Sequence, residues 1–141
     1  MIKVFRILYY FTVVTSALVG LWHFFVPCMF QWYDYLPMQY ENLIVGIDYT
    51  NYCFSALLFG HSLLLVILGK RALKLNREVV IFYSFLTAVW VFRAALASFI
   101  EPWPLEPIPA AAIGQLAAAD VLAVMMVIVS VKLWTEIKRR K

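Results

Sequence analysis

The chain has 141 residues, of which 65% are hydrophobic and 14% are charged, and its formal net charge is +4. This composition excludes an ordinary soluble domain, because such domains carry about 25% charged residues and at most about half apolar ones. The basic residues flank long apolar runs, so the positive charge indicates a membrane protein rather than a nucleic-acid partner.

Four apolar runs predict an all-α membrane protein, with transmembrane helices at about 4–30, 49–69, 79–100 and 110–134 forming one four-helix bundle over 1–141. We expect outer cap loops at about 31–48 and 101–109. Lysines and arginines stand at both ends and between the second and third runs, whereas most acidic residues lie in the other two connections. The positive-inside rule therefore predicts that both termini are cytoplasmic.

The first run is too long for a signal peptide and is followed by no small-residue cleavage site, so we expect a retained helix. Its residues Thr12, Ser16, Gly20 and His23 recur at spacings of three and four. This spacing puts them on one helical face, and small or hydroxyl residues on one face predict contact with another helix. Pro27 either kinks the helix or ends it.

The second connection and the second run carry further polar residues. The stretch 41–48 is either a short interfacial helix or an early start to the second span. We favour an ordered outer cap, and the alternative is a solvated loop with an amphipathic pattern. At about 100° per residue one narrow sector of the second span contains Asp48, Asn51, Ser55 and Ser62. His61 points about 100° away from that sector.

Arg93 lies inside the third run, which has no other charge between Glu78 and Glu101. An isolated arginine at the bilayer centre costs roughly 2.5–3.5 kcal/mol on insertion scales, so its side chain needs partners. A rise of about 1.5 Å per residue puts His23, Arg93 and Gln115 about 9–11 Å below the outer ends of their helices, and Asp120 and His61 at about 16 Å.

We therefore expect an ion pair between Arg93 and Asp120, with His23 and Gln115 satisfying the remaining donors. The predicted ligand-binding set comprises the polar residues of all four spans: His23, Arg93, Gln115, Asp120, His61, Asp48 and Asn51. Two interpretations stay open. The set is either a ligand or proton site, or a structural pair that joins the third and fourth spans.

Cofactor motifs are scarce in this sequence. Cys28 and Cys53 have no CxxC spacing, so we predict no zinc site and leave open whether they form a disulfide or stay as inert thiols. A haem between His23 and His61 is not expected, because their estimated depths differ by about 6 Å.

The stretch 101–109 has four prolines and should form a stiff extended cap. Small residues begin the fourth span, which allows close packing against another helix.

The segment Gly20-Leu21-Trp22-His23-Phe24-Phe25-Val26-Pro27 resembles the Gly-x-x-His-(apolar)-Pro signature near the end of the first helix in DoxX-like small membrane proteins. Only His23 and Pro27 carry over. The resemblance implies four spans with cytoplasmic termini in a bacterial inner membrane. Because several DoxX-like proteins are linked to quinone-coupled oxidation of sulfur compounds, it also implies a quinone as a cofactor.

These observations lead to two hypotheses of function. In the first, a buried polar site in the outer half of the bundle binds a quinone-like or lipid-like molecule and has a redox-accessory role, with Arg93 holding a ligand oxygen, His23 exchanging a proton and Asp120 orienting Arg93. In the second, the chain is an assembly subunit of a larger membrane complex. Membrane lipids are the expected partners, a homo-oligomer or larger complex stays open, and no catalytic residue is assigned.

Overall fold

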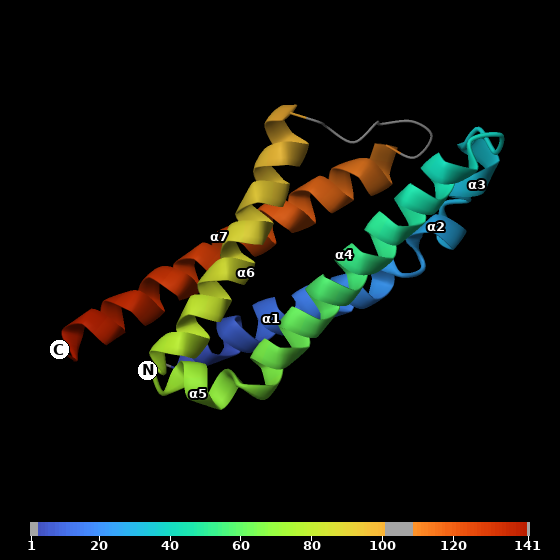
Figure 1. Cartoon of the computed structure of the whole chain (residues 1–141). Helices are drawn as coiled ribbons and strands as arrows, with labels where there is room; N and C mark the ends of the chain where they lie inside the picture. The colour runs from blue at the N-terminus through green and yellow to red at the C-terminus, as the bar shows by residue number, and fades with distance from the viewer. Residues whose placement is uncertain (1–2, 101–108, 141) are drawn as a thin grey trace. The chain divides into compact units, whose positions relative to one another are not determined.

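The computed structural model describes residues 3–100 and 109–140 (Figure 1), and all regular elements in these ranges are helices. In chain order they are α1 (Lys3–His23), α2 (Val26–Met29), α3 (Trp32–Tyr35), α4 (Glu41–Ile67), α5 (Gly69–Leu73), α6 (Arg77–Ala95), the π-helix η1 (Leu96–Ile100) and α7 (Pro109–Arg139). The predicted proline-rich cap lies outside the described residues, apart from the start of α7.

Four of these helices are long and apolar enough to cross a membrane: Lys3–His23, Glu41–Ile67, Arg77–Ile100 and Ile113–Arg139. The prediction of an all-helical chain with four candidate transmembrane helices is thereby confirmed, and these helices indicate an integral membrane protein. Hydrocarbon accepts such helices because every backbone hydrogen bond inside them is satisfied within the segment.

The first helix is shorter than expected, because α1 ends at His23 rather than near residue 30. Pro27 stands in the first turn of α2, where its missing N–H costs nothing. A continuous helix would bring the proline ring against the carbonyl of the residue four positions earlier, which is His23. Pro27 therefore ends the helix instead of kinking it.

The second spanning helix begins earlier than we favoured. The expected ordered cap at 41–48 is wrong, because Glu41 through Asp48 form the first turns of α4. Leu43 favours a helix, whereas Ile44, Val45 and Gly46 do not, so the early start does not follow from local helix propensity. Glu41 lies in the first turn, where its negative charge is favourable at the positive end of the helix dipole.

The described residues group into two compact units, and each is considered by itself below. The first unit combines Met1–Thr12 with Ile67–Lys141, and the second unit is Val13–Val66. The helix α1 is thus divided between them.

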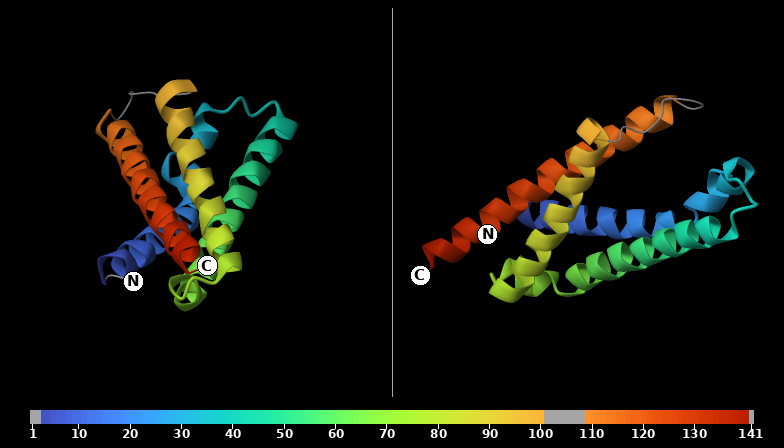
Figure 2. Two further views of the ribbon diagram at one scale, coloured as in Figure 1. Left: turned by 90° about the vertical axis from the view of Figure 1, so that its left-hand side faces the viewer. Right: turned by 45° about the horizontal axis from the view of Figure 1, so that its top comes forward.

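In the second unit, the C-terminal part of α1 lies alongside α4 (Figure 2). The hydroxyls of Ser16 and Ser62 are 2.8 Å apart and both side chains are fully buried. A Cβ atom on Gly20 would lie 2.5 Å from the backbone nitrogen of Phe59, so only glycine allows this approach. The prediction that the Ser16–Gly20 face contacts another helix is confirmed.

In the first unit, α6 and α7 cross and form its most extensive helix pair (Figures 1 and 2). The buried rings of Tyr9 and Tyr83 stack with centroids 4.9 Å apart. The Tyr83 hydroxyl lies 3.0 Å from Thr12 Oγ1. Since Thr12 already donates to the Tyr9 carbonyl, Tyr83 is the donor in this pair. This cluster attaches the first turns of α1 to α6.

Candidate functional site

A groove of about 480 Å³ lies in the first unit, between the C-terminal part of α6, η1 and the middle of α7. Its lining residues are spaced three or four apart on each helix, so each helix contributes one face. They are Val91, Ala94, Ala95, Ser98 and Phe99 on one side, and Asp120, Ala123, Val124, Val127 and Ile128 on the other. Its volume falls in the range of roughly 300–1,000 Å³ that is typical of small-molecule sites.

The groove exists because small side chains face each other across it. Ala94 and Ala95 on α6 stand opposite Ala123 on α7, so no large side chain fills the space. The π-helix η1 follows directly, and short π-helical segments in α-helices often occur at functional sites. The result is an apolar hollow inside the span of two candidate transmembrane helices.

Asp120 is the charged residue among those that line the groove. Its side chain is half-buried, and the Arg93 guanidinium lies within electrostatic range of its carboxylate. A charge of this kind in an apolar groove at membrane depth is costly without a compensating partner. The groove is therefore mostly apolar, and its polar side chains are Asp120 and Ser98.

The expected direct ion pair between Arg93 and Asp120 is not formed: among the described residues, no contact of 4.0 Å or less joins them. The guanidinium lies instead over the ring of Trp90, 5.6 Å from its centroid. Helical side chains lean towards the N-terminus, so Arg93 reaches the buried ring three positions earlier, and the cation–π contact offsets part of its desolvation. The Arg93 guanidinium and the Asp120 carboxylate therefore interact electrostatically without direct contact.

Gln115 does not share the groove. It is half-buried on α7 but stands five residues before Asp120, which at about 100° per residue is roughly 140° around the helix. Of the predicted residues in the first unit, Asp120 lines the groove, and Arg93 lies outside it but within electrostatic range of Asp120.

In the second unit, the side chain of Asn51 contacts the backbone of His23. The Asn51 amide donates to the carbonyl of His23 at 3.0 Å. This carbonyl belongs to the last residue of α1, and carbonyls at a helix C-terminus have no N–H partner within the helix. The Asn51 amide therefore supplies the missing hydrogen-bond donor. The His23 ring nitrogen Nδ1 lies 2.9 Å from the Val19 carbonyl, and the ring packs edge-on against Trp22 and Phe54.

Asp48 serves a different contact at the end of the second unit. Its carboxylate accepts a hydrogen bond of 2.8 Å from the Tyr33 hydroxyl and thereby joins α3 to α4. This hydrogen bond is the main cause that raises the pKa of Tyr33 to about 12. Asp48 therefore holds the connecting segment in place.

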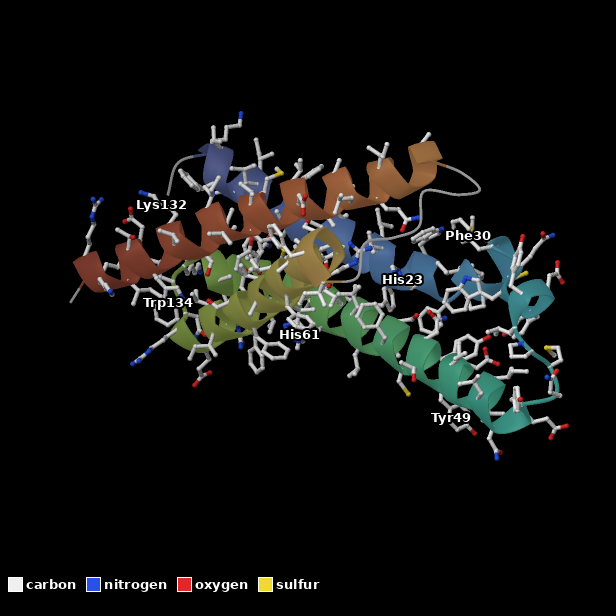
Figure 3. All side chains as sticks on the ribbon, turned by 90° about the horizontal axis from the view of Figure 1, so that it is seen from above. His23, Phe30, Tyr49, His61, Lys132 and Trp134 are labelled. Atoms are coloured by element: carbon white, nitrogen blue, oxygen red, sulfur yellow. The ribbon has the colours of Figure 1, made fainter. Side chains whose placement is uncertain are left out.

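His61 is half-buried on α4, next to Ser62. Because Ser62 contacts Ser16 whereas Asn51 contacts His23, the two histidines lie roughly two helical turns, or about 10 Å, apart along the unit (Figure 3). Among the described residues, no group of three His, Cys, Asp or Glu side chains could hold a metal ion.

Two further features bear on the search for a site. Cys28 and Cys53 are both free thiols on exposed positions. A surface hollow at Gln39–Leu43 is lined by consecutive residues only, so it is the outer side of a turn and brings no separate elements together.

The sequence reasoning missed the polar contacts in the core of the first unit. Trp134 donates its indole N–H to the Ser84 hydroxyl at 2.9 Å, and Ser84 also lies 3.1 Å from Ser130. The signal that could have revealed them is the presence of hydroxyl residues within otherwise apolar runs on both helices.

The fold and the groove define the class as a helical membrane protein with an apolar hollow between two spanning helices. Beyond this class, no protein-family model, no curated protein and no solved structure matches the chain.

Proposed function

We propose that the chain binds an elongated, quinone-like or lipid-like molecule in the groove between α6, η1 and α7. The observation that carries this proposal is the groove itself: about 480 Å³ of mostly apolar lining with one carboxylate, Asp120, within two candidate transmembrane helices. An apolar site with few polar groups is the usual form of a small-molecule site.

The Asp120 carboxylate, as the charged group of the groove, favours a ligand with a small polar head. An ionised Asp120 only accepts hydrogen bonds, whereas Arg93 only donates them. A head that carries hydroxyl groups donates to the Asp120 carboxylate, while an apolar tail covers the alanine-lined wall. Arg93 does not line the groove, so it acts by balancing the charge of Asp120 rather than by holding a ligand oxygen.

The proposed orientation has both termini in the cytoplasm, as the distribution of lysine and arginine predicts. We also propose membership of the DoxX-like proteins and a bacterial inner membrane. The support is local: Gly20 is needed for close helix contact, and Pro27 ends α1 just after His23. A proton-exchange role of His23 and a redox-accessory role stay predictions.

The proposal is tested by purifying the full chain in a mild detergent and identifying co-purified hydrophobic molecules by mass spectrometry and absorption spectroscopy. A groove-filling variant, Ala94→Leu with Ala123→Leu, should lose the bound molecule, because leucine side chains occupy its space. The matched control Val131→Leu, at an exposed position of α7, should retain it.

Two results would overturn the proposal: no bound molecule in the wild-type protein, or equal retention by the groove-filling variant. If the groove variants, together with Arg93→Leu, change only the assembly with other membrane proteins, the alternative of a structural subunit is supported instead.

A further inference from the structure

The short helix α5 connects two candidate transmembrane helices with very little chain. Leu68 alone separates it from α4, and 74–76 separate it from α6. Because α4 and α6 are each long and apolar enough to span a membrane, a helix held this closely between them lies at the membrane surface. Its exposed side chains therefore stand in the headgroup layer.

One side of α5 is packed and the other is basic. Gly69 and Ala72 are buried, whereas Lys70, Arg71 and Lys74 are exposed. A Cβ atom on Gly69 would lie 2.7 Å from the ring of Tyr10, so the backbone of α5 rests directly on an α1 side chain. This contact determines which side of α5 faces outward.

The turn after α5 is equally well defined. Leu75 has a φ of 68°, and the backbone N–H of Asn76 donates to the Arg71 carbonyl at 3.0 Å. The Asn76 side chain then accepts a hydrogen bond from the Val79 N–H at 3.1 Å and caps α6. As a result, Arg77, the first residue of α6, follows α5 in a fixed geometry.

We propose that this surface is a binding platform for the phosphate groups of anionic phospholipids. The platform consists of Lys70, Arg71, Lys74 and Arg77, which are all exposed. Among the described residues, none of the four takes part in an ion pair of 4.0 Å or less. Their charges are thus available to the headgroup layer, where anionic lipid attracts basic residues.

The basic C-terminal end of α7 differs from this platform. There Glu136 already pairs with Lys132 at 2.6 Å and lies 3.7 Å from Arg139, so part of the positive charge is neutralised locally. Lys132 also lies over the Phe5 ring, with its Nζ 5.5 Å from the ring centroid. The C-terminal cluster therefore supplies a control with a similar number of basic residues and a different local geometry.

The test compares binding of phosphatidylglycerol with binding of phosphatidylcholine to the purified full chain, by native mass spectrometry from detergent micelles. One variant replaces Lys70, Arg71, Lys74 and Arg77 by glutamine. The control variant replaces Lys138, Arg139, Arg140 and Lys141 by glutamine. We expect the platform variant to lose the preference for the anionic lipid by about tenfold or more, and the control by less than about threefold.

The proposal is overturned if wild-type protein shows no preference for phosphatidylglycerol, or if both variants lose it equally. Folding of each variant is checked by circular dichroism. If the fourfold platform variant does not fold, Arg71→Gln with Lys74→Gln provides the comparison, with Arg139→Gln and Arg140→Gln as its control, and the same two outcomes decide. Loss of lipid preference with an unchanged groove ligand would separate this platform from the proposed function of the groove.

Discussion

The two helix pairs of this chain use small residues in opposite ways. In the second unit, Gly20 meets the backbone of Phe59, so the contact between α1 and α4 is closed. In the first unit, Ala94 and Ala95 face Ala123, and the space between them stays open as a groove. Small residues close an interface when they meet a backbone, and they leave a hollow when they meet other small residues.

Replacing Gly20 by alanine should produce the largest effect, because the new methyl group would lie 2.5 Å from a backbone atom that cannot move alone. We expect a loss of about 1–3 kcal/mol in the free energy of unfolding. The measurement is denaturant unfolding in detergent micelles, followed by tryptophan fluorescence.

Gly60→Ala is the matched control, since nothing lies within 4 Å of a Cβ atom there. It should be neutral or stabilise the helix by up to about 1 kcal/mol. Equal destabilisation by both substitutions would contradict the closed contact at Gly20.

A smaller loss is expected from Tyr83→Phe in the first unit. The substitution removes the hydrogen bond to Thr12 but keeps the ring stack on Tyr9. The free energy of unfolding should fall by about 1 kcal/mol, as for other buried hydrogen bonds. In the same unfolding assay, Tyr35→Phe serves as the control because Tyr35 is 78% exposed, and a loss of similar size there would contradict the prediction.

The contact between Tyr33 and Asp48 should add less than about 1 kcal/mol, because it is exposed. It carries a pH signature, since the pKa of Tyr33 is raised to about 12. The protonated tyrosine is favoured in the folded state, so this contribution is fully present below the ordinary tyrosine pKa of about 10. It declines as the pH rises through 12.

Both the wild-type protein and the Tyr33→Phe variant are titrated and followed by ultraviolet absorption. The difference between the two curves should show one tyrosine that ionises near pH 12. In Asp48→Asn the same difference should move towards the ordinary value. If the Tyr33 titration midpoint in the wild-type protein lies at the ordinary tyrosine value, the hydrogen bond between Tyr33 and Asp48 is contradicted.

The smallest effect on stability is expected from Ala94→Leu in the groove, because Ala94 lines the groove and is only partly buried. The added carbon atoms extend into the groove, so the free energy of unfolding should change by no more than about 1 kcal/mol. The contrast with Gly20→Ala, measured in the same unfolding assay, directly tests the difference between the closed and the open helix pair. A loss as large as that of Gly20→Ala would show that the groove is closed in solution.

Several elements of the fold could be read from the sequence. The length and apolarity of the runs predicted four spanning helices, and the spacing of Ser16 and Gly20 predicted a contact face. The early start of α4 at Glu41 was only an alternative, because an acidic residue begins both a surface loop and a helix. The end of α1 at His23 was open for a similar reason, since proline permits either a kink or a stop.

The candidate site was harder to predict. Depth estimates brought Arg93 and Asp120 together, and the structure places them within electrostatic range but without a direct ion pair. The estimate could not include Trp90, which takes the guanidinium instead. The groove was not predicted at all, because alanines on two separate helices give no signal until the helices are placed side by side.

The sequence alone determined that the chain has four helices long and apolar enough to span a membrane, because hydrophobic length acts locally along the chain. Only the tertiary structure decided which side chains meet. A shift of one residue turns a helical side chain by about 100° and moves it by about 1.5 Å, so packing alone sets these contacts. For this reason the sequence did not show that Asp120 lines a groove, that Asn51 donates to the His23 carbonyl, or that Asp48 accepts a hydrogen bond from Tyr33.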